Sequence, residues 1–199
     1  MGLNSNERQR VIVVGVPGVG KSTVLDNLMA VLSKGNLDAQ RVNFGTVMME
    51  LAREFNVKNR DDLRKLNLQN QKVLQIKAAQ EIASKNIGLL IIDTHVFVRT
   101  RDGLWPGLPK DVLKNLAPTN LILIQADPKI ILDRRQKDKS RHRDIIHLRE
   151  VSQDLELARS TLVAISALTN SPILIVENAE RKAKDAALTI AYSLGVDLS

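Results

Sequence analysis

The segment Gly15–Thr23, GVPGVGKST, places three glycines before a lysine, a serine and a threonine, directly after the apolar run VIVVG. It matches the pattern Gly-x-x-x-x-Gly-Lys-Ser/Thr in full. Glycines let backbone N–H groups close around an anion, the lysine reaches the β- and γ-phosphates, and the serine hydroxyl is a Mg²⁺ ligand. The segment therefore predicts a nucleoside triphosphate site formed by Gly15, Val16, Pro17, Gly18, Val19, Gly20, Lys21, Ser22 and Thr23.

A carboxylate is expected near the same phosphates. Asp93 ends the apolar run LLIID, where a strand would deliver its side chain to the ligand edge of a sheet. Together with Ser22 it forms the predicted metal site, with Asp93 acting through a coordinated water.

Arginines occur in three separate parts of the chain that could face this phosphate site. Arg64 lies in a helical region, Arg99 and Arg101 follow the sequence DTH, and the run after a fourth strand contains Arg134, Arg135, Lys137, Lys139, Arg141 and Arg143. Transfer between two anionic substrates needs such cations, whereas hydrolysis needs one nucleotide and a positioned water. The pattern favours a kinase. His95, in DTH, is interpreted as packing or hydrogen-bonding near the acceptor pocket.

Composition restricts the other possibilities. The 199 residues contain 44% apolar and 26% charged side chains and no cysteine, which excludes disulfides and cysteine-based zinc sites and fits a cytoplasmic location. No apolar run approaches the length of a membrane span, and no signal peptide is expected. The net charge of +7 suits nucleotides or nucleic acid, but only 3% of the residues are aromatic, which disfavours single-strand binding.

Apolar strands alternate with helical patterns along the whole chain. Strands are predicted at 11–15, 38–44, 88–93, 120–127 and 171–178, with helices at 21–33, 128–137, 146–169 and 180–195 and two or three more within 46–85. Apolar strands separated by helices are typical of a parallel sheet covered on both faces. We therefore expect a single α/β domain over residues 1–199, a three-layer P-loop NTPase sandwich with a five-stranded parallel sheet. A helical insert spans 45–86 and a short lid 134–145.

Beyond the loop, five segments carry a family resemblance: NFGTVM, RDDLRKL, IIDTHVFVRT, WPGLP and ADPKIILDRRQKDKSRHRD. With them the chain resembles the archaeal type of adenylate kinase, from about Val11 to Leu194. This resemblance implies the reversible, Mg²⁺-dependent reaction ATP + AMP = 2 ADP and a homotrimer. It places the AMP phosphate on Arg64 and Arg99, with Thr46 and His95 nearby. It also implies lid arginines at Arg134, Arg141 and Arg143 and the ATP adenine beside Asn178.

Two positions depart from the family pattern, and several functions stay open. Thr46 stands where relatives often have Asp, and Lys137 where some have another arginine, a role that Arg135 could take over.

The main alternative is a nucleoside monophosphate kinase with CMP, UMP or broader base preference. An RNA-associated ATPase and a structural trimer with a vestigial loop are disfavoured by the ligand-facing arginines and by the intact Lys21, Ser22 and Asp93. No specific nucleic acid or membrane partner is expected.

Overall fold

The computed structural model describes residues 8–35, 37–55, 57, 59–100, 103–137 and 147–196. Its main sheet has five strands in the order β2-β3-β1-β6-β7, and every neighbouring pair is parallel. The predicted five-stranded parallel sheet is thus confirmed. In chain order the strands are β1 (Gln9–Val14), β2 (Ala39–Asn43), β3 (Leu89–Asp93), β6 (Asn120–Gln125) and β7 (Ile173–Glu177).

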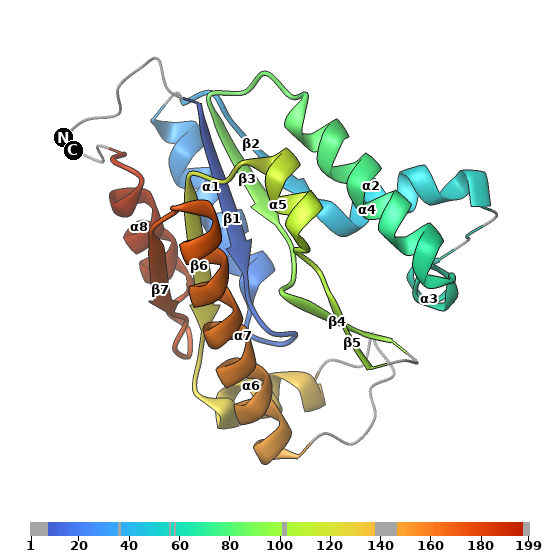
Figure 1. Cartoon of the computed structure of the whole chain (residues 1–199). Coiled ribbons are helices and arrows are strands. Elements are labelled where there is room, and N and C mark those ends of the chain that lie inside the picture. The colour runs from blue at the N-terminus through green and yellow to red at the C-terminus, as the bar shows by residue number, and fades with distance from the viewer. Residues whose placement is uncertain are drawn as a thin grey trace.

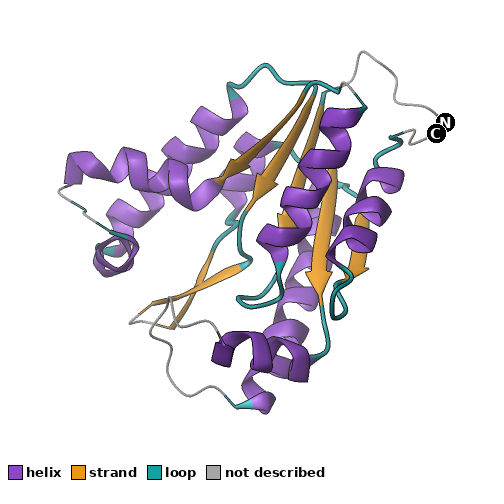
Figure 2. Cartoon of the chain, turned by 180° about the vertical axis from the view of Figure 1, so that it is seen from behind, coloured by secondary structure: helices purple, strands orange, loops and turns teal. Residues whose placement is uncertain are grey.

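Helices cover both faces of this sheet, as the uninterrupted apolar strands predict (Figures 1 and 2). On one face α1 and α8 pack against each other, and on the other face α7 lies over β6 and β7. The helices of this α/β core are α1 (Lys21–Lys34), α5 (Lys110–Leu116), α6 (Pro128–Lys137), α7 (Leu148–Thr169) and α8 (Ala183–Ser193).

The centre of the sheet forms the hydrophobic core. Val11 to Val14 of β1 are fully buried, and every residue of β3 is buried, including Asp93. The edge strand β2 is more polar, with the sequence AQRVN and only Val42 buried. Central strands are therefore specified by continuous apolar runs, whereas β2 brings polar side chains to the same edge of the sheet.

The predicted insert folds as four helical pieces, one more than the upper limit expected from the sequence: α2 (Phe44–Leu51), a 3₁₀ turn η1 (Ala52–Phe55), α3 (Arg60–Lys65) and α4 (Leu68–Ala83). Asn43 and Asn67 cap α2 and α4 by accepting backbone N–H groups three residues later. The insert buries its own small cluster and also packs α4 against α5. In Figure 1 it projects from the β2 side of the sheet.

A two-stranded antiparallel hairpin, which the sequence patterns did not reveal, follows β3. Strands β4 (Phe97–Thr100) and β5 (Gly103–Pro106) are each four residues long, too short for a clear alternation of polar and apolar residues. The hairpin and α6 lie beyond the carboxyl ends of the main strands, where α/β sheets bind ligands (Figure 1). Within the described part of the chain, no helix is both long and apolar enough to cross a bilayer.

Candidate active site

The loop between β1 and α1 has a backbone that only glycines fit at two positions. Gly18 and Gly20 both have φ of +86°, in the left-handed region. A Cβ on Gly18 would lie 2.7 Å from Cγ of Arg135, and one on Gly20 would lie 2.5 Å from Nδ2 of Asn178. Gly20 also precedes the 14-residue helix α1 and provides no capping side chain, and the N-terminus of a helix is a favourable place for an anion.

Arg134 and Asn178 support this loop from outside. Nη1 of Arg134 and Nδ2 of Asn178 donate to the Val19 carbonyl at 2.9 and 2.8 Å. Nη2 of Arg134 also contacts the carbonyls of Asn178 and Ala179 at 3.2 and 3.3 Å. These contacts join the P-loop to α6 and to the segment after β7. Both residues were predicted at the site from the sequence, and the structure brings them together around one loop carbonyl.

Two further side chains hold loop carbonyls. The buried Arg135 donates from Nε to the Pro17 carbonyl at 2.6 Å. Nδ1 of His95 lies 3.1 Å from the Gly15 carbonyl. These four side chains together engage the carbonyl oxygens of Gly15, Pro17 and Val19, which fixes the loop backbone. Arg135 therefore supports the P-loop in this structure. From the sequence, it was a candidate to replace the lid arginine that some relatives have at the position of Lys137.

Asp93 is the centre of a buried ionic cluster. It is 1% exposed and contacts Nζ of Lys21 through Oδ1. Its Oδ2 accepts from Nη2 of Arg41 at 2.6 Å and from Nδ2 of Asn43 at 3.2 Å. Nη1 of Arg41 reaches Asp26 at 2.7 Å. A buried carboxylate needs such partners, and here it has two cations.

The strand register explains why these groups meet. Asn43 pairs with Asp93, and Arg41 pairs with Ile91, two residues earlier on both strands. Side chains two residues apart share a face of a sheet, so Arg41, Asn43 and Asp93 point to the same side. Arg41 was missed from the sequence because β2 was read only as a strand. The available signal was an arginine and an asparagine in i, i+2 positions beside a strand that ends in Asp.

Arg99 on β4 forms an ion pair with Asp154 of α7, with 2.6 Å between Nη2 and Oδ1. The other carboxylate oxygen of Asp154 lies 3.8 Å from Nη2 of Arg135. Asp154 therefore connects the hairpin to a residue that supports the P-loop. A shallow hollow of about 500 Å³ lies beside this pair, lined by Arg99, Leu104, Gln153, Asp154, Glu156, Leu157 and Ser160.

Gln75 connects the insert to the hairpin. The buried amide of Gln75 donates to the Pro106 carbonyl at 2.9 Å and accepts from Nε1 of Trp105 at 3.1 Å. Thr46 lies at the start of α2, where its N–H bonds Oδ1 of Asn43 at 3.0 Å. The Gln75 contacts thus join the insert to β5, whereas the Thr46 contact caps the first helix of the insert.

The remaining predicted residues are placed only in part. Arg141 and Arg143 lie outside the described residues, as does most of the predicted lid 134–145. Arg64 lies on α3, but its side chain is not described. Lys137 is exposed at the end of α6, where a hydrogen bond to Asp133 and the charge of that carboxylate raise the pKa of the Lys137 ammonium.

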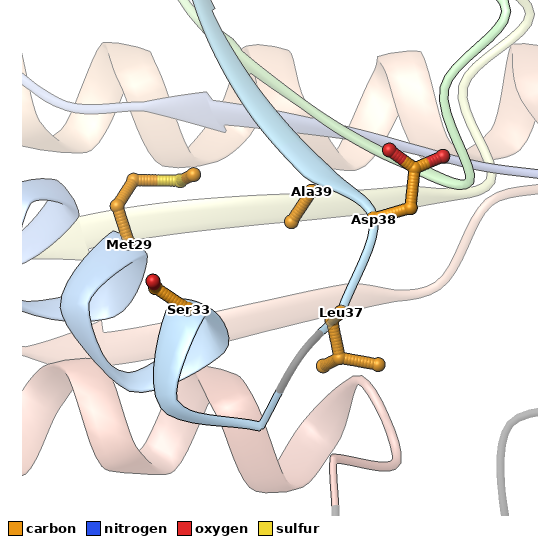
Figure 3. Close-up of a pocket in the computed structure, with 5 residues that line it drawn as sticks. All are labelled: Met29, Ser33, Leu37, Asp38 and Ala39. Carbon is orange, nitrogen blue, oxygen red and sulfur yellow. The ribbon is translucent and has the colours of Figure 1, made fainter.

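A second hollow, of about 420 Å³, lies between α1 and β2 and is lined by Met29, Ser33, Leu37, Asp38 and Ala39 (Figure 3). It sits at the start of β2, at the opposite end of that strand from Asn43 and the P-loop. The Asp38 carboxylate accepts the Gly88 N–H at 2.9 Å, which joins the starts of β2 and β3. We assign this hollow no part in the chemistry.

A parallel sheet with a glycine-rich loop after its first strand, a lysine on the first turn of the next helix and surrounding arginines defines a P-loop kinase. Among solved structures, shikimate kinase from Bacteroides thetaiotaomicron has a TM-score of 0.61 at 13% identity and covers 94% of this chain and 99% of that one. The tunicamycin resistance protein of Deinococcus radiodurans has a TM-score of 0.64 at 17% identity, with 96% and 98% covered. These likenesses establish the fold.

Sequence comparison identifies the family. A model described as an AAA domain matches residues 14–152. The adenylate kinase of Sulfurisphaera tokodaii is 41% identical over 189 residues, which cover 92% of this chain and 97% of that protein. The adenylate kinase of Saccharolobus solfataricus is 38% identical and has the same coverage of both chains. The adenylate kinase of Methanocaldococcus jannaschii is also 38% identical, over 84% of this chain and 88% of that protein. The chain belongs to the adenylate kinase family, as its motifs predict.

Proposed function

We propose that the protein catalyses ATP + AMP = 2 ADP, in both directions, at the carboxyl edge of the sheet. The observation that carries this proposal is the identity to curated adenylate kinases along nearly the whole chain, loop and hairpin included. In the forward direction an oxygen of the AMP phosphate bonds to the γ-phosphorus of ATP. The bond from that phosphorus to the β–γ bridging oxygen breaks, and ADP leaves with those electrons. The attacking oxygen needs no general base, because the phosphate is already anionic at neutral pH.

The donor nucleotide is assigned to the P-loop. The N–H groups at the start of α1 and the ammonium of Lys21 would hold the phosphates, and side chains of Arg134 and Arg135 already engage the loop carbonyls of Val19 and Pro17. Lys21 then exchanges its contact with Asp93 for the phosphates. Asn178 follows β7 next to the loop, which supports the assignment of the ATP base to that segment.

Mg²⁺ is assigned to Ser22 and Asp93. Ser22 is exposed on the first turn of α1, and Asp93 offers carboxylate oxygens close to Lys21, so both are hard oxygen donors of the kind that Mg²⁺ prefers. Both Asp93 oxygens already have protein partners, which fits contact through water rather than direct ligation. No group of three His, Asp or Glu residues gathers as a metal site in the described part of the chain. The ion would neutralise charge on the transferring phosphates.

The acceptor nucleotide is assigned between the hairpin and the insert. Arg99 and Arg64 would bind its phosphate, with Thr46 and His95 at the same side, and Arg134, Arg141 and Arg143 would stabilise charge during transfer. The exposed ion pair of Arg99 with Asp154 supports this assignment, because it shows an arginine already paired with an anion at this edge. We also propose, from the family resemblance, a homotrimer located in the cytoplasm.

The test measures ADP formed from Mg-ATP with AMP, CMP, UMP, GMP or water as acceptor. We expect AMP to be the preferred acceptor by at least about tenfold, a difference of about 1.4 kcal/mol. Turnover with AMP no faster than with water would refute the proposal. Faster turnover with CMP or UMP would select the alternative base preference.

A further inference from the structure

Arg41 contacts Asp93 directly but belongs to neither the loop motif nor the acceptor motifs. We infer that Arg41 is a positioning residue: it holds Asp93 so that Lys21 can leave that carboxylate and bind the nucleotide. This inference rests on the proposed role of Lys21 in phosphate binding. It concerns a residue that acts through Asp93 rather than by touching substrate.

The first argument is the division of the carboxylate. Lys21 contacts Oδ1 of Asp93, whereas Arg41 contacts Oδ2 at 2.6 Å, so the two cations do not share an oxygen. Departure of Lys21 therefore leaves the guanidinium contact intact. Asn43, at 3.2 Å from the same Oδ2, is a neutral second donor.

The second argument is burial. Asp93 is 1% exposed, and a buried carboxylate that loses its only cation is strongly destabilised. With Arg41 in place, the release of Lys21 exchanges a doubly paired carboxylate for a singly paired one. Without Arg41, the same release would leave Asp93 with the Asn43 amide alone among the contacts described here. Asp93 would then retain Lys21, and ATP would compete less well for the ammonium.

The third argument is the fixed position of the guanidinium. Nη1 of Arg41 reaches Asp26 on α1 at 2.7 Å while Nη2 reaches Asp93, so one planar fork spans two carboxylates. Arginine stays charged at any relevant pH, and its fork is rigid. A lysine at this position would keep the charge but could not span both carboxylates in the same way.

The experiment measures ATP affinity by titration calorimetry with EDTA present, on the full chain and without acceptor. We expect Arg41→Met to weaken ATP binding about tenfold and Arg41→Lys to weaken it about threefold. Arg10 provides a matched control, because this strand arginine donates to the Leu116 and Ala83 carbonyls at 3.1 and 3.0 Å, far from the loop. Arg10→Met is expected to lower the unfolding temperature and leave ATP affinity within about twofold.

A double-mutant cycle separates positioning from a general structural role. In a Lys21→Met background there is no ammonium to release, so adding Arg41→Met is expected to change ATP affinity less than about twofold. An equal loss in both backgrounds would overturn the inference, because Arg41 would then act by its own charge or through the fold. An unchanged affinity in the wild-type background would overturn it as well. If Arg41→Met does not fold, Arg41→Lys in both backgrounds gives the same comparison.

The failure of this inference is distinguishable from failure of the proposed function. ATP binding without metal or acceptor tests Arg41, whereas turnover with AMP tests the reaction. Suppose that the wild-type protein binds ATP and that the Arg41 variants bind it more weakly, as expected. If the wild-type protein then does not phosphorylate AMP, only the proposed reaction is refuted.

Discussion

Replacement of Asp154 by Asn should make the protein bind AMP more tightly. Arg99 is assigned to the acceptor phosphate, and in the structure its Nη2 lies 2.6 Å from Oδ1 of Asp154. A phosphate that binds Arg99 must displace or share this contact. Asp154→Asn removes the competing charge while keeping nearly the same shape, so the guanidinium is available to AMP without first breaking an ion pair.

The size of the effect follows from exposure. The Arg99 side chain is 65% exposed and that of Asp154 18%, so water screens the pair. Exposed ion pairs contribute about 0.2–1 kcal/mol, which corresponds to a decrease of about 1.4- to 5-fold in KM for AMP. The KM for ATP should change less than about twofold. Arg135, which supports the P-loop, lies 3.8 Å from Asp154, so it loses little when that charge is removed, and it keeps its 2.6 Å bond to the Pro17 carbonyl.

Steady-state rates at varied AMP and saturating Mg-ATP measure this effect. Asp185→Asn is the matched control. Asp185 lies on α8, outside the site, and its carboxylate pairs with Lys182 at 2.9 Å. An unchanged KM for AMP would show that Arg99 does not leave Asp154 to bind the acceptor. An increased KM would show that Asp154 holds Arg99 in its productive position and would contradict competition between Asp154 and AMP for this guanidinium.

Three further substitutions test other parts of the site. Lys21→Met should reduce turnover by at least about a thousandfold, because it removes the ammonium assigned to the phosphates. It should also lower the unfolding temperature, because the buried Asp93 loses one of its cations. A rate within about tenfold of wild type would exclude the assigned role. Gly20→Ala should lower the unfolding free energy by about 1–2 kcal/mol, because φ at this position is +86° and the new methyl meets Nδ2 of Asn178. Urea titration measures this loss, and a change under about 0.3 kcal/mol would contradict the loop geometry. Arg143→Ala should lower kcat at least about tenfold with little change in either KM, and activity within about twofold of wild type would contradict its assignment to transfer.

The central sheet and the loop could be predicted because local sequence determines them. Continuous apolar runs identified β1, β3, β6 and β7, of which the three central strands β1, β3 and β6 are mostly buried. The glycines of the loop are required by its backbone. The strand at 38–44 was placed within a residue of β2 (Ala39–Asn43), although its polar side chains are typical of an edge. The helix expected to begin at 180 begins at Ala183, after Arg181, which has φ of 60°.

The parts that could not be predicted depend on contacts between distant segments. The hairpin of β4 and β5 is stabilised by pairing between two four-residue strands, and the buried Gln75 links it to the insert through Trp105 and Pro106. The role of Arg41 follows only from the register of β2 against β3. Arg135 looked like a ligand-facing cation, and its burial against Pro17 is visible only once α6 is placed.

The most direct measurement follows the phosphoryl group itself. ATP labelled on the γ-phosphate is incubated with Mg²⁺ and unlabelled AMP, and products are separated before equilibrium. We predict that the label appears as the β-phosphate of ADP formed from AMP, at a rate that depends on AMP concentration, with inorganic phosphate at the level of a protein-free control. Release of the label as inorganic phosphate at a rate independent of AMP would contradict transfer between two nucleotides and identify water as the acceptor.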